Sequence, residues 1–348
     1  MGNKKYIVKL TPHDKFFFGG EKSFGQKEDD KKQNTNYFVK SNYFPQQTGV
    51  LGFVRHQLLL QCNHDKIFKD NRIQDKSKAD KLIGKQSFRI NEAFEFGAIQ
   101  CISPVFICKN KSNYYFPANK EYQCNKDTDS YDFLEIKLGE NPLLDKYDPK
   151  IGLDDLFINN IKNKISYKTI FSEVQQVGIR KKYEGGTDDN AYYMQTFLKF
   201  NKNFCFAFIV ELEENIKFNS QNIAIFGGEQ QAFKMEVKES DINFDSLLPK
   251  YKGSKETDKI VLVSDAYVSN DITDKCDFAI TETIDFRFLE TDTNKNGNYY
   301  KNPTKSSKFN LYKKGSVFYG NTSEIEKLLK NNTFEKLGYN HYKIITKK

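Results

Sequence analysis

Residues 203–212, with the sequence NFCFAFIVEL, restrict the possible folds of this chain more than any other segment. In a strand, successive side chains point to opposite faces of the sheet. Phe204, Phe206 and Phe208 then lie on one face, and the other face carries Cys205, an alanine and an isoleucine. A strand that is apolar on both faces belongs in the middle of a covered sheet. The sequence therefore predicts a sheet whose two faces are both covered.

A helix of almost unbroken apolar character is predicted to begin at Thr48, whose hydroxyl can cap the first free backbone N–H groups. Apolar side chains share one face at helical spacing and extend nearly round the helix, which predicts that it is buried. They are Val50, Leu51, Phe53, Val54, Leu58, Leu59 and Leu60. Gly49 and Gly52 each cost about 1 kcal/mol of helix propensity relative to alanine. Two interpretations stay open: a tight packing contact, or close approach of an anion such as a nucleic-acid phosphate.

The remaining chain alternates strand patterns with polar, glycine-rich turns and contains few helices. A second amphipathic helix is predicted over residues 322–331, where Ser323 and Glu326 have capping-box spacing. This pattern indicates an α+β protein in two halves. The polar, turn-rich segment before residue 150 places the division there, which gives an N-terminal domain of residues 1–150 and a C-terminal domain of residues 151–348.

Composition narrows the class of protein. Lys and Arg number 54 against 46 Asp and Glu, and this net charge of +8 suits a polyanionic partner without establishing one. The six cysteines contain no C-x-x-C pair and the four histidines no H-x-x-x-H pattern, so we predict no metal site and no cofactor. No apolar run approaches the ~20 residues that span a bilayer, and no signal peptide is visible. We expect a cytoplasmic protein with reduced cysteines and no membrane partner.

Five motifs, in this order, resemble those of RAMP proteins in type III CRISPR effectors, and together they cover nearly the whole chain. They are TPHDKFFFGG (11–20), FPQQTGVLGFVRHQLL (44–59), VGIRKKYEGGTDDNAYYMQTFLKF (177–200), IAIFGGEQQAF (223–233) and KKGSVFYG (313–320). The second is similar to a family helix motif through Pro45, Thr48, Gly52 and Arg55. The chain departs from the family pattern at Gln230–Gln231, where arginine is usual, and in several enlarged loops.

The resemblance implies two ferredoxin-like domains of the RRM-like, RAMP type, with long loop insertions. The most similar group is the subunit of the type III-B (Cmr) complex that holds the 5′ tag of the crRNA and docks on the large polymerase and nuclease subunit. Such a subunit is not itself a nuclease. It would contact the backbone RAMP subunit, and one of its hairpins would wedge near the first guide–target position, close to the target RNA. The equivalent subunit of a III-A or III-D complex is an alternative.

The resemblance also implies RNA contacts in four parts of the chain. Glycines in the loop after the first strand let the backbone approach RNA, with a lysine on a phosphate and a phenylalanine stacked on a base. Donors at the start of the helix, and an arginine within it, meet phosphate oxygens. A basic cluster and a glycine turn complete the surface. The implied RNA-binding residues are Phe16, Phe18, Gly19, Gly20, Lys22, Ser23, Gln46, Thr48, Gly49, Arg55, Arg180, Lys181, Lys182, Tyr183, Gly227 and Gly228.

Each of these roles has a structural alternative that the sequence leaves open. Phe16 and Phe18 are also explained as core side chains, and Thr48 as a plain helix cap. Arg55 is also explained as a charge that reaches from the helix to solvent. The basic cluster can be a solvated turn, and the glycine turn a tight hairpin with no ligand.

A different class of function is a metal-independent endoribonuclease that processes crRNA. His13 in the N-terminal loop would then act as a general acid or base at a 2′-hydroxyl, as in the sister crRNA-processing enzymes. No second histidine or tyrosine is placed by sequence to complete a catalytic pair. The GGTDD run at 185–189 only superficially resembles a nucleotidyl-cyclase motif. We therefore predict a protein that is not an enzyme.

Overall fold

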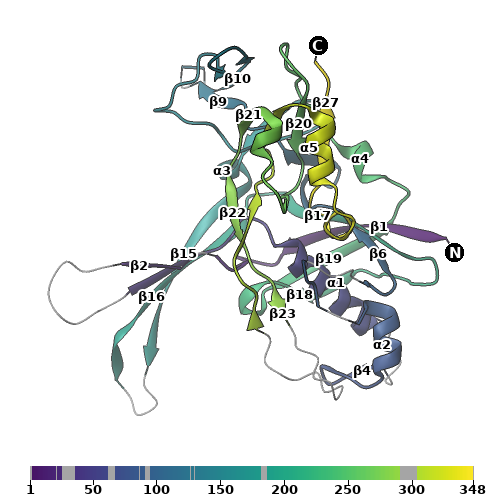
Figure 1. Cartoon of the computed structure of the whole chain (residues 1–348). Coiled ribbons are helices and arrows are strands. Elements are labelled where there is room, and N and C mark those ends of the chain that lie inside the picture. The colour runs from purple at the N-terminus through teal and green to yellow at the C-terminus, as the bar shows by residue number, and fades with distance from the viewer. Residues whose placement is uncertain are drawn as a thin grey trace.

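The computed structural model describes residues 2–20, 22–25, 36–61, 67–85, 87–90, 95–125, 127–128, 130–181, 186–290 and 304–347 (Figure 1). Its largest element is a nine-stranded sheet in the order β14-β13-β8-β7-β17-β1-β19-β18, with β6 also paired to β17. The strands are β1 (Asn3–Pro12), β6 (Ile99–Ile102), β7 (Phe106–Lys109), β8 (Asn113–Pro117), β13 (Leu156–Ile158), β14 (Lys164–Ser166), β17 (Phe204–Glu213), β18 (Gln221–Ile225) and β19 (Ala232–Glu239).

The strand predicted to be apolar on both faces is β17, and it lies in the middle of this sheet. Phe206 and Phe208 are fully buried on one face, in the main core with α1 (Gln47–Gln61). Ala207 is fully buried on the other face, in a second core with Phe244 of the short helix α4 (Phe244–Leu247). The prediction that both faces of this strand are covered is confirmed.

Helix α1 begins at Gln47, so the prediction that Thr48 is its N-cap is wrong. The hydroxyl of Tyr339, which is 292 residues away in sequence, accepts the Gln47 backbone N–H at 3.1 Å. The Gln47 side-chain amide donates to the carbonyl oxygens of Ser103 and Gly338 at 2.9 and 3.2 Å. A tertiary contact therefore holds the helix start where the sequence suggested a local cap.

Four strands form a separate sheet in the order β15-β16-β3-β2. They are β2 (Lys22–Gly25), β3 (Asn36–Lys40), β15 (Phe171–Lys181) and β16 (Thr187–Phe200). Figure 1 shows that they extend away from the body of the molecule, and we call this sheet the arm. β16 and β15 pair antiparallel, whereas β16 and β3 pair in parallel.

The C-terminal part forms a third sheet in the order β21-β26-β20-β27, with every pair antiparallel. Its strands are β20 (Lys259–Leu262), β21 (Cys276–Ile280), β26 (Val317–Gly320) and β27 (Tyr342–Ile345). Helix α5 (Thr322–Leu329) connects β26 toward β27 and buries Ile325 and Leu329 against the sheet. Its N-cap is Asn321, whose side chain accepts the Glu324 N–H. The predicted capping box at Ser323 is therefore wrong, because Ser323 already lies inside the first turn.

The remaining elements are short. They are β4 (Phe68–Lys69), β5 (Arg72–Ile73), α2 (Lys76–Ile83), β9 (Tyr122–Asn125), β10 (Ser130–Phe133), β11 (Ile136–Lys137), β12 (Leu143–Leu144), α3 (Tyr167–Ile170), η1 (Gly228–Gln230), η2 (Thr273–Lys275), β22 (Thr283–Phe286), β23 (Leu289–Glu290), β24 (Thr304–Lys305), β25 (Phe309–Tyr312) and α6 (Asn332–Lys336). The predicted strand-rich mixture of α and β elements is confirmed. Among the described residues, no helix is long and apolar enough to cross a membrane.

A buried ion pair joins the C-terminal sheet to the chain that follows β8. The Lys259 ammonium on β20 lies 2.7 and 2.6 Å from the two carboxylate oxygens of Glu121, and both side chains are at most 1% exposed. Tyr319 and Asn119 also donate hydrogen bonds to this carboxylate. Buried charges persist only when they are paired and hydrogen-bonded in this way.

Replacement of Lys259 with methionine leaves the Glu121 carboxylate buried without its counter-charge. We expect Lys259→Met to lower the free energy of unfolding by about 3–5 kcal/mol, measured by urea denaturation. The matched control is Lys327→Met, which breaks an exposed pair with Glu324 at 2.6 Å and should change stability by less than about 1 kcal/mol. Equal, small effects of both substitutions would contradict the importance of the buried pair.

Removal of the Tyr339 hydroxyl leaves the buried Gln47 N–H without an acceptor. We expect Tyr339→Phe to lower the free energy of unfolding by about 1–3 kcal/mol. Tyr147→Phe serves as the control, because Tyr147 is 41% exposed and its hydroxyl can bond to water. A Tyr339→Phe protein as stable as the wild type would show that the helix start does not depend on this contact.

Candidate nucleic-acid interface

Three glycine-bearing elements that the sequence analysis selected separately lie together in the structure. The Gly228 N–H donates to the carbonyl oxygen of Phe17 at 2.8 Å, which joins the β18–β19 turn to the loop after β1. The ring of Phe226 lies 5.2 Å from that of Phe18 and 4.8 Å from that of Phe53 on α1. We call this cluster the glycine site. It comprises Gly19, Gly20, Gly227, Gly228 and the first two turns of α1.

Different structural features explain why glycine occupies positions 19, 20 and 227. A Cβ atom on Gly20 would lie 1.6 Å from the carbonyl oxygen of Lys40, and one on Gly227 would lie 2.8 Å from that of Phe17. Close backbone packing therefore requires glycine at these two positions. Gly19 has a φ of +47° and is exposed, and a Cβ there would meet no atom within 4 Å. The site is thus open at Gly19 and closely packed at Gly20 and Gly227.

Helix α1 presents an exposed stripe beside these loops. Gln46, Gly49 and Gly52 are exposed, and Leu60 is 42% exposed, so the prediction that this helix is buried nearly all round is wrong on this side. A Cβ atom on Gly49 or Gly52 would have no heavy atom within 4 Å. Packing within the described residues therefore does not explain these glycines. The two glycines leave the backbone of α1 accessible on this exposed side.

The backbone donors at the start of α1 are already used. Tyr339 accepts the Gln47 N–H, and the N–H and hydroxyl of Thr48 also face the phenol oxygen. Burial, helped by the nearby Asp265 carboxylate, raises the pKa of Tyr339, so the phenol stays neutral. The predicted phosphate contacts through the Thr48 donors therefore have a competing partner inside the protein. Gln46 and Gly49 keep an exposed position on this stripe.

Phe16 and Phe18 belong to the core. Phe16 is 0% exposed and Phe18 is 9% exposed. Their rings lie 5.0 Å apart and pack on Phe206 and Phe233. A buried ring offers no free face to a base, so the stacking role proposed for both residues is not supported. Clustering of phenylalanines around β17 explains them.

The basic residues that were predicted to bind RNA lie on the arm. Lys22 and Ser23 pair with Val39 and Phe38 across β2 and β3. Arg180 and Lys181 end β15, beside a bulge in its pairing with β16. The structure therefore brings two sequence-distant predicted groups into one sheet. Lys182 and Tyr183 lie outside the described residues.

The arm also exposes apolar side chains that the sequence analysis did not select. Val177 is 64% exposed and Ile179 is 44% exposed, and both point to the same face of β15. Their exposure could not be predicted from the sequence, because valine and isoleucine are also the usual residues of a buried strand. Val177 and Ile179 therefore form a pair of exposed apolar side chains on the projecting hairpin.

Arg55 lies away from the glycine loops, at the C-terminal end of α2. A Cβ atom on Gly84, the C-cap of α2, would lie 3.0 Å from its guanidinium. The partial negative charge at a helix C-terminus favours a cation there. The Nε and Nη2 atoms of Arg55 are buried, so the prediction that this charge reaches to solvent is wrong. The guanidinium instead packs on the end of α2, away from the start of α1.

Lys314 is a cation near the start of α1 that sequence reasoning missed. Its ammonium lies 3.1 Å from the centre of the Phe44 ring, three residues before α1 begins. Burial lowers the pKa of Lys314 to about 8. No local pattern signals this contact, because β25–β26 and the turn before α1 are distant in sequence.

His13 is exposed, and its Nε2 atom lies 2.8 Å from the carbonyl oxygen of Asn222. Among the described residues, its imidazole makes no hydrogen bond to a second acid–base side chain. The neighbouring Asp14 pairs with Lys199 at 3.1 Å. This arrangement adds nothing to the endoribonuclease alternative beyond the histidine itself.

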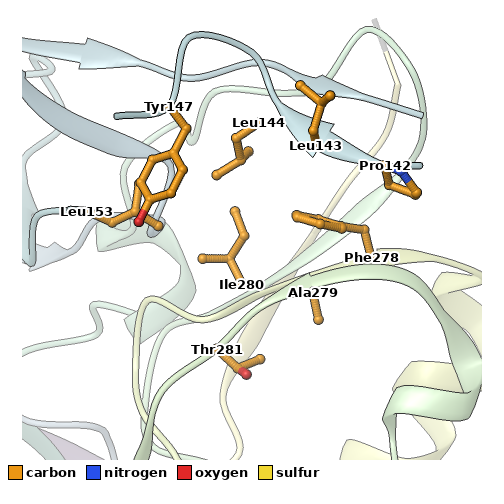
Figure 2. A pocket seen from close by; sticks show the side chains of 9 residues that line it. All are labelled: Pro142, Leu143, Leu144, Tyr147, Leu153, Phe278, Ala279, Ile280 and Thr281. Atoms are coloured by element: carbon orange, nitrogen blue, oxygen red, sulfur yellow. The ribbon is translucent and has the colours of Figure 1, made fainter. Parts of the chain in front are cut away.

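A shallow apolar groove of about 570 Å³ lies elsewhere, between the chain around β12 and the strand β21 (Figure 2). Its lining residues are Pro142, Leu143, Leu144, Tyr147, Leu153, Phe278, Ala279, Ile280 and Thr281. The lining contains no lysine or arginine, so the groove does not suit a phosphate backbone. Within the described part of the chain, no cluster of three or more His, Cys, Asp or Glu side chains is arranged to hold a metal ion.

The chain is similar in fold to subunits of known complexes. One match is a chain of the cryo-EM structure of the type III-B Cmr-beta bound to cognate target RNA and AMPPnP, with a TM-score of 0.50 and 16% identity. The structural match covers 97% of this chain and 95% of the Cmr-beta chain. A chain of the Cmr-beta structure bound to cognate target RNA also has a TM-score of 0.50 and 16% identity, with coverage of 97% and 96%.

No curated protein is similar enough in sequence to match this chain. The family described as CRISPR-associated protein (Cas_Cmr3) matches residues 8–150 and 154–347. This match spans almost all of the chain and includes all five motifs on which the resemblance rested. The predicted relationship to type III-B (Cmr) subunits is confirmed, and the chain belongs to the CRISPR-associated protein (Cas_Cmr3) family.

Proposed function

We propose that this chain is a non-catalytic RNA-binding subunit of a type III-B CRISPR complex, which holds the 5′ tag of the crRNA. One observation carries the proposal: the glycine site packs directly on the end of the arm strand β3. Gly20 of the glycine site packs on the carbonyl oxygen of Lys40, the last residue of β3 in the arm. RNA that crosses the exposed stripe of α1 then reaches the basic end of the arm without leaving the protein.

The two RAMP domains correspond, in this proposal, to the nine-stranded sheet and the C-terminal four-stranded sheet. In the first, β1 lies between β19 and β17, with β7 beyond β17, and α1 follows β1. In the second, β20 lies between β27 and β26, with β21 outermost, and α5 precedes β27. Both have the strand arrangement of a β-α-β-β-α-β unit with one helix reduced. We therefore place the domain boundary between β19 and β20, after the residue 150 that the sequence suggested.

Both sheets are covered on both faces, which constrains how RNA is held. One face of the second sheet packs on α5, and the other packs on Ile136, Leu144 and Leu153. An RRM stacks bases on the open face of its sheet. Here no such face is free among the described strands of these two sheets, so the loops and the arm have to make the RNA contacts.

The partners follow from this placement. The glycine site holds the crRNA tag, and the arm projects toward the guide, where exposed Val177 and Ile179 wedge beside the first guide–target position. The large polymerase subunit and a backbone RAMP subunit contact the body on either side. The similar Cmr-beta structures contain cognate target RNA, which supports a target strand near this surface. An equivalent subunit of a III-A or III-D complex is the second candidate.

The first experiment is co-purification of tagged protein from a host that expresses the neighbouring genes, followed by sequencing of bound RNA. Short RNAs with a uniform 5′ end, crosslinked near the glycine site or Arg180, are expected. Recovery of the protein without RNA or partners would overturn the proposal. Cleavage of repeat RNA by wild-type protein and its loss in His13→Ala would instead establish the endoribonuclease alternative.

Alanine at Gly49 and Gly52 separates stability from RNA binding. Each substitution adds about 1 kcal/mol of helix propensity, and neither new methyl group meets another atom. We expect the Gly49→Ala/Gly52→Ala protein to resist urea better than wild type but to bind crRNA more weakly in a filter-binding assay. Ser77→Ala on the exposed side of α2 is the control, and it should leave RNA binding unchanged. A stabilised double variant with wild-type affinity would remove α1 from the interface.

The basic end of the arm should determine the salt dependence of binding. For single-stranded RNA, log K falls by roughly 0.7 per decade of salt for each neutralised phosphate. We expect Arg180→Ser/Lys181→Ser to weaken binding and to flatten this slope by about 0.7 for each phosphate that is no longer neutralised. Lys327→Ser/Lys330→Ser, in α5 and at its C-cap, removes the same charge from side chains that pair with Glu324 and Glu326. An equal slope for both double variants would show that net charge alone acts.

A further inference from the structure

The turn that joins β18 to β19 has an unusual backbone. The Phe226 N–H donates to the carbonyl oxygen of Gln231 at 2.9 Å and closes a loop of four residues. Within it, Glu229 has a φ of +57° and Gln230 a φ of +48°. Side chains other than glycine seldom adopt this left-handed region, and asparagine and aspartate tolerate it best.

Two other consecutive pairs with positive φ occur among the described residues. They are Asp70–Asn71 between β4 and β5 and Asn110–Lys111 between β7 and β8. Both contain asparagine, which hairpin turns of this kind favour. The pair Glu229–Gln230 contains neither asparagine nor aspartate, although glycines occupy the two preceding positions. The turn therefore keeps two longer side chains where local geometry favours smaller ones.

No contact inside the protein explains these side chains. Glu229 and Gln230 are exposed, and neither side chain makes a hydrogen bond or ion pair within the described part of the chain. The side-chain amide of the neighbouring Gln231 donates to the backbone carbonyl oxygen of Glu229 at 3.1 Å and leaves both side chains uncontacted. Residues held in a strained conformation without internal compensation are frequent at binding sites, where the strain presents a side chain to a ligand.

The position and chemistry of the turn indicate which part of a nucleic acid it meets. The same turn supplies Gly227 and Gly228 to the glycine site, where Gly228 donates to Phe17. It carries no cation, and the Glu229 carboxylate repels phosphate. A carboxylate accepts hydrogen bonds from N–H groups, and an amide both donates and accepts. These groups match a base edge, and carboxylates pair with exocyclic amino groups in particular.

We propose that Glu229 and Gln230 read the Watson–Crick edge of one unstacked base of the bound crRNA, a base that carries an exocyclic amino group. The inference rests on the proposed function and adds a specificity determinant to it. Gly19 and α1 hold the RNA backbone close, while Glu229 and Gln230 in this turn recognise one base of the RNA. Single-stranded RNA is commonly recognised in this way, because splayed bases expose their hydrogen-bonding edges.

The test uses the full chain in its complex, freed of the co-purified RNA and reassembled with RNAs copied from the 5′ end of the recovered crRNA. In each copy, one base lacks its amino group: inosine replaces guanosine, purine riboside replaces adenosine and zebularine replaces cytidine. We expect one replacement to weaken binding to wild type about tenfold, equivalent to ~1.4 kcal/mol. Glu229→Gly/Gln230→Gly should bind the unmodified RNA about tenfold more weakly and ignore that replacement.

Stability distinguishes this role from a structural one. Glycine removes the strain at both positions, so we expect the double variant to melt at the wild-type temperature or above it. Asn110→Gly changes the matched turn between β7 and β8 and should leave RNA affinity and base discrimination intact. Wild-type affinity and discrimination in Glu229→Gly/Gln230→Gly would overturn the inference alone. A wild-type complex that holds no crRNA would overturn the proposed function and the inference together.

Discussion

The fold depends on the pairing of β1 with two strands from the second half of the chain. Tyr6 to Leu10 pair with Val210 to Phe206 of β17 on one side and with Glu239 to Met235 of β19 on the other. This ladder places the N-terminal strand in the middle of the nine-stranded sheet. The loop after β1 and the turn before β19 are thereby brought to the same end of adjacent strands. The glycine site exists because of this register.

The local sequence pattern was sufficient to predict secondary structure wherever neighbouring residues determine it. The alternation in β17 was predictable, because period-2 patterns report directly on strands. The start of α1 was not predictable in detail, since its acceptor is the Tyr339 hydroxyl. The N-cap of α5 was misplaced by two residues, because asparagine at 321 and serine at 323 are both good caps.

In the candidate site, too, features set by local sequence were predictable, and features set by tertiary packing were not. Motif order identified the family, and the three glycine elements were found because glycine clusters are visible in sequence. Burial was not visible in the same way: Phe16 and Phe18 could be base platforms or core residues until β17 was seen to pack on them. The arm shows the opposite error, since Val177 and Ile179 look like ordinary strand residues and prove to be exposed. An apolar residue indicates function mainly when the tertiary structure leaves it exposed, and its exposure cannot be predicted from the local sequence.

The central place of β1 also determines when this protein can fold during its synthesis. β1 ends at Pro12, but its partner β19 ends at Glu239. At 5–20 residues per second, the ribosome needs on the order of 10–45 s to make the chain between them. For most of that time, until Glu213 completes β17, β1 has neither of its native neighbours, and its apolar side chains and unpaired backbone are open to other strands. Because β1 stays unpaired for so long, the nine-stranded sheet has to form soon after β17 and β19 are synthesised, before β1 pairs with a strand of another chain.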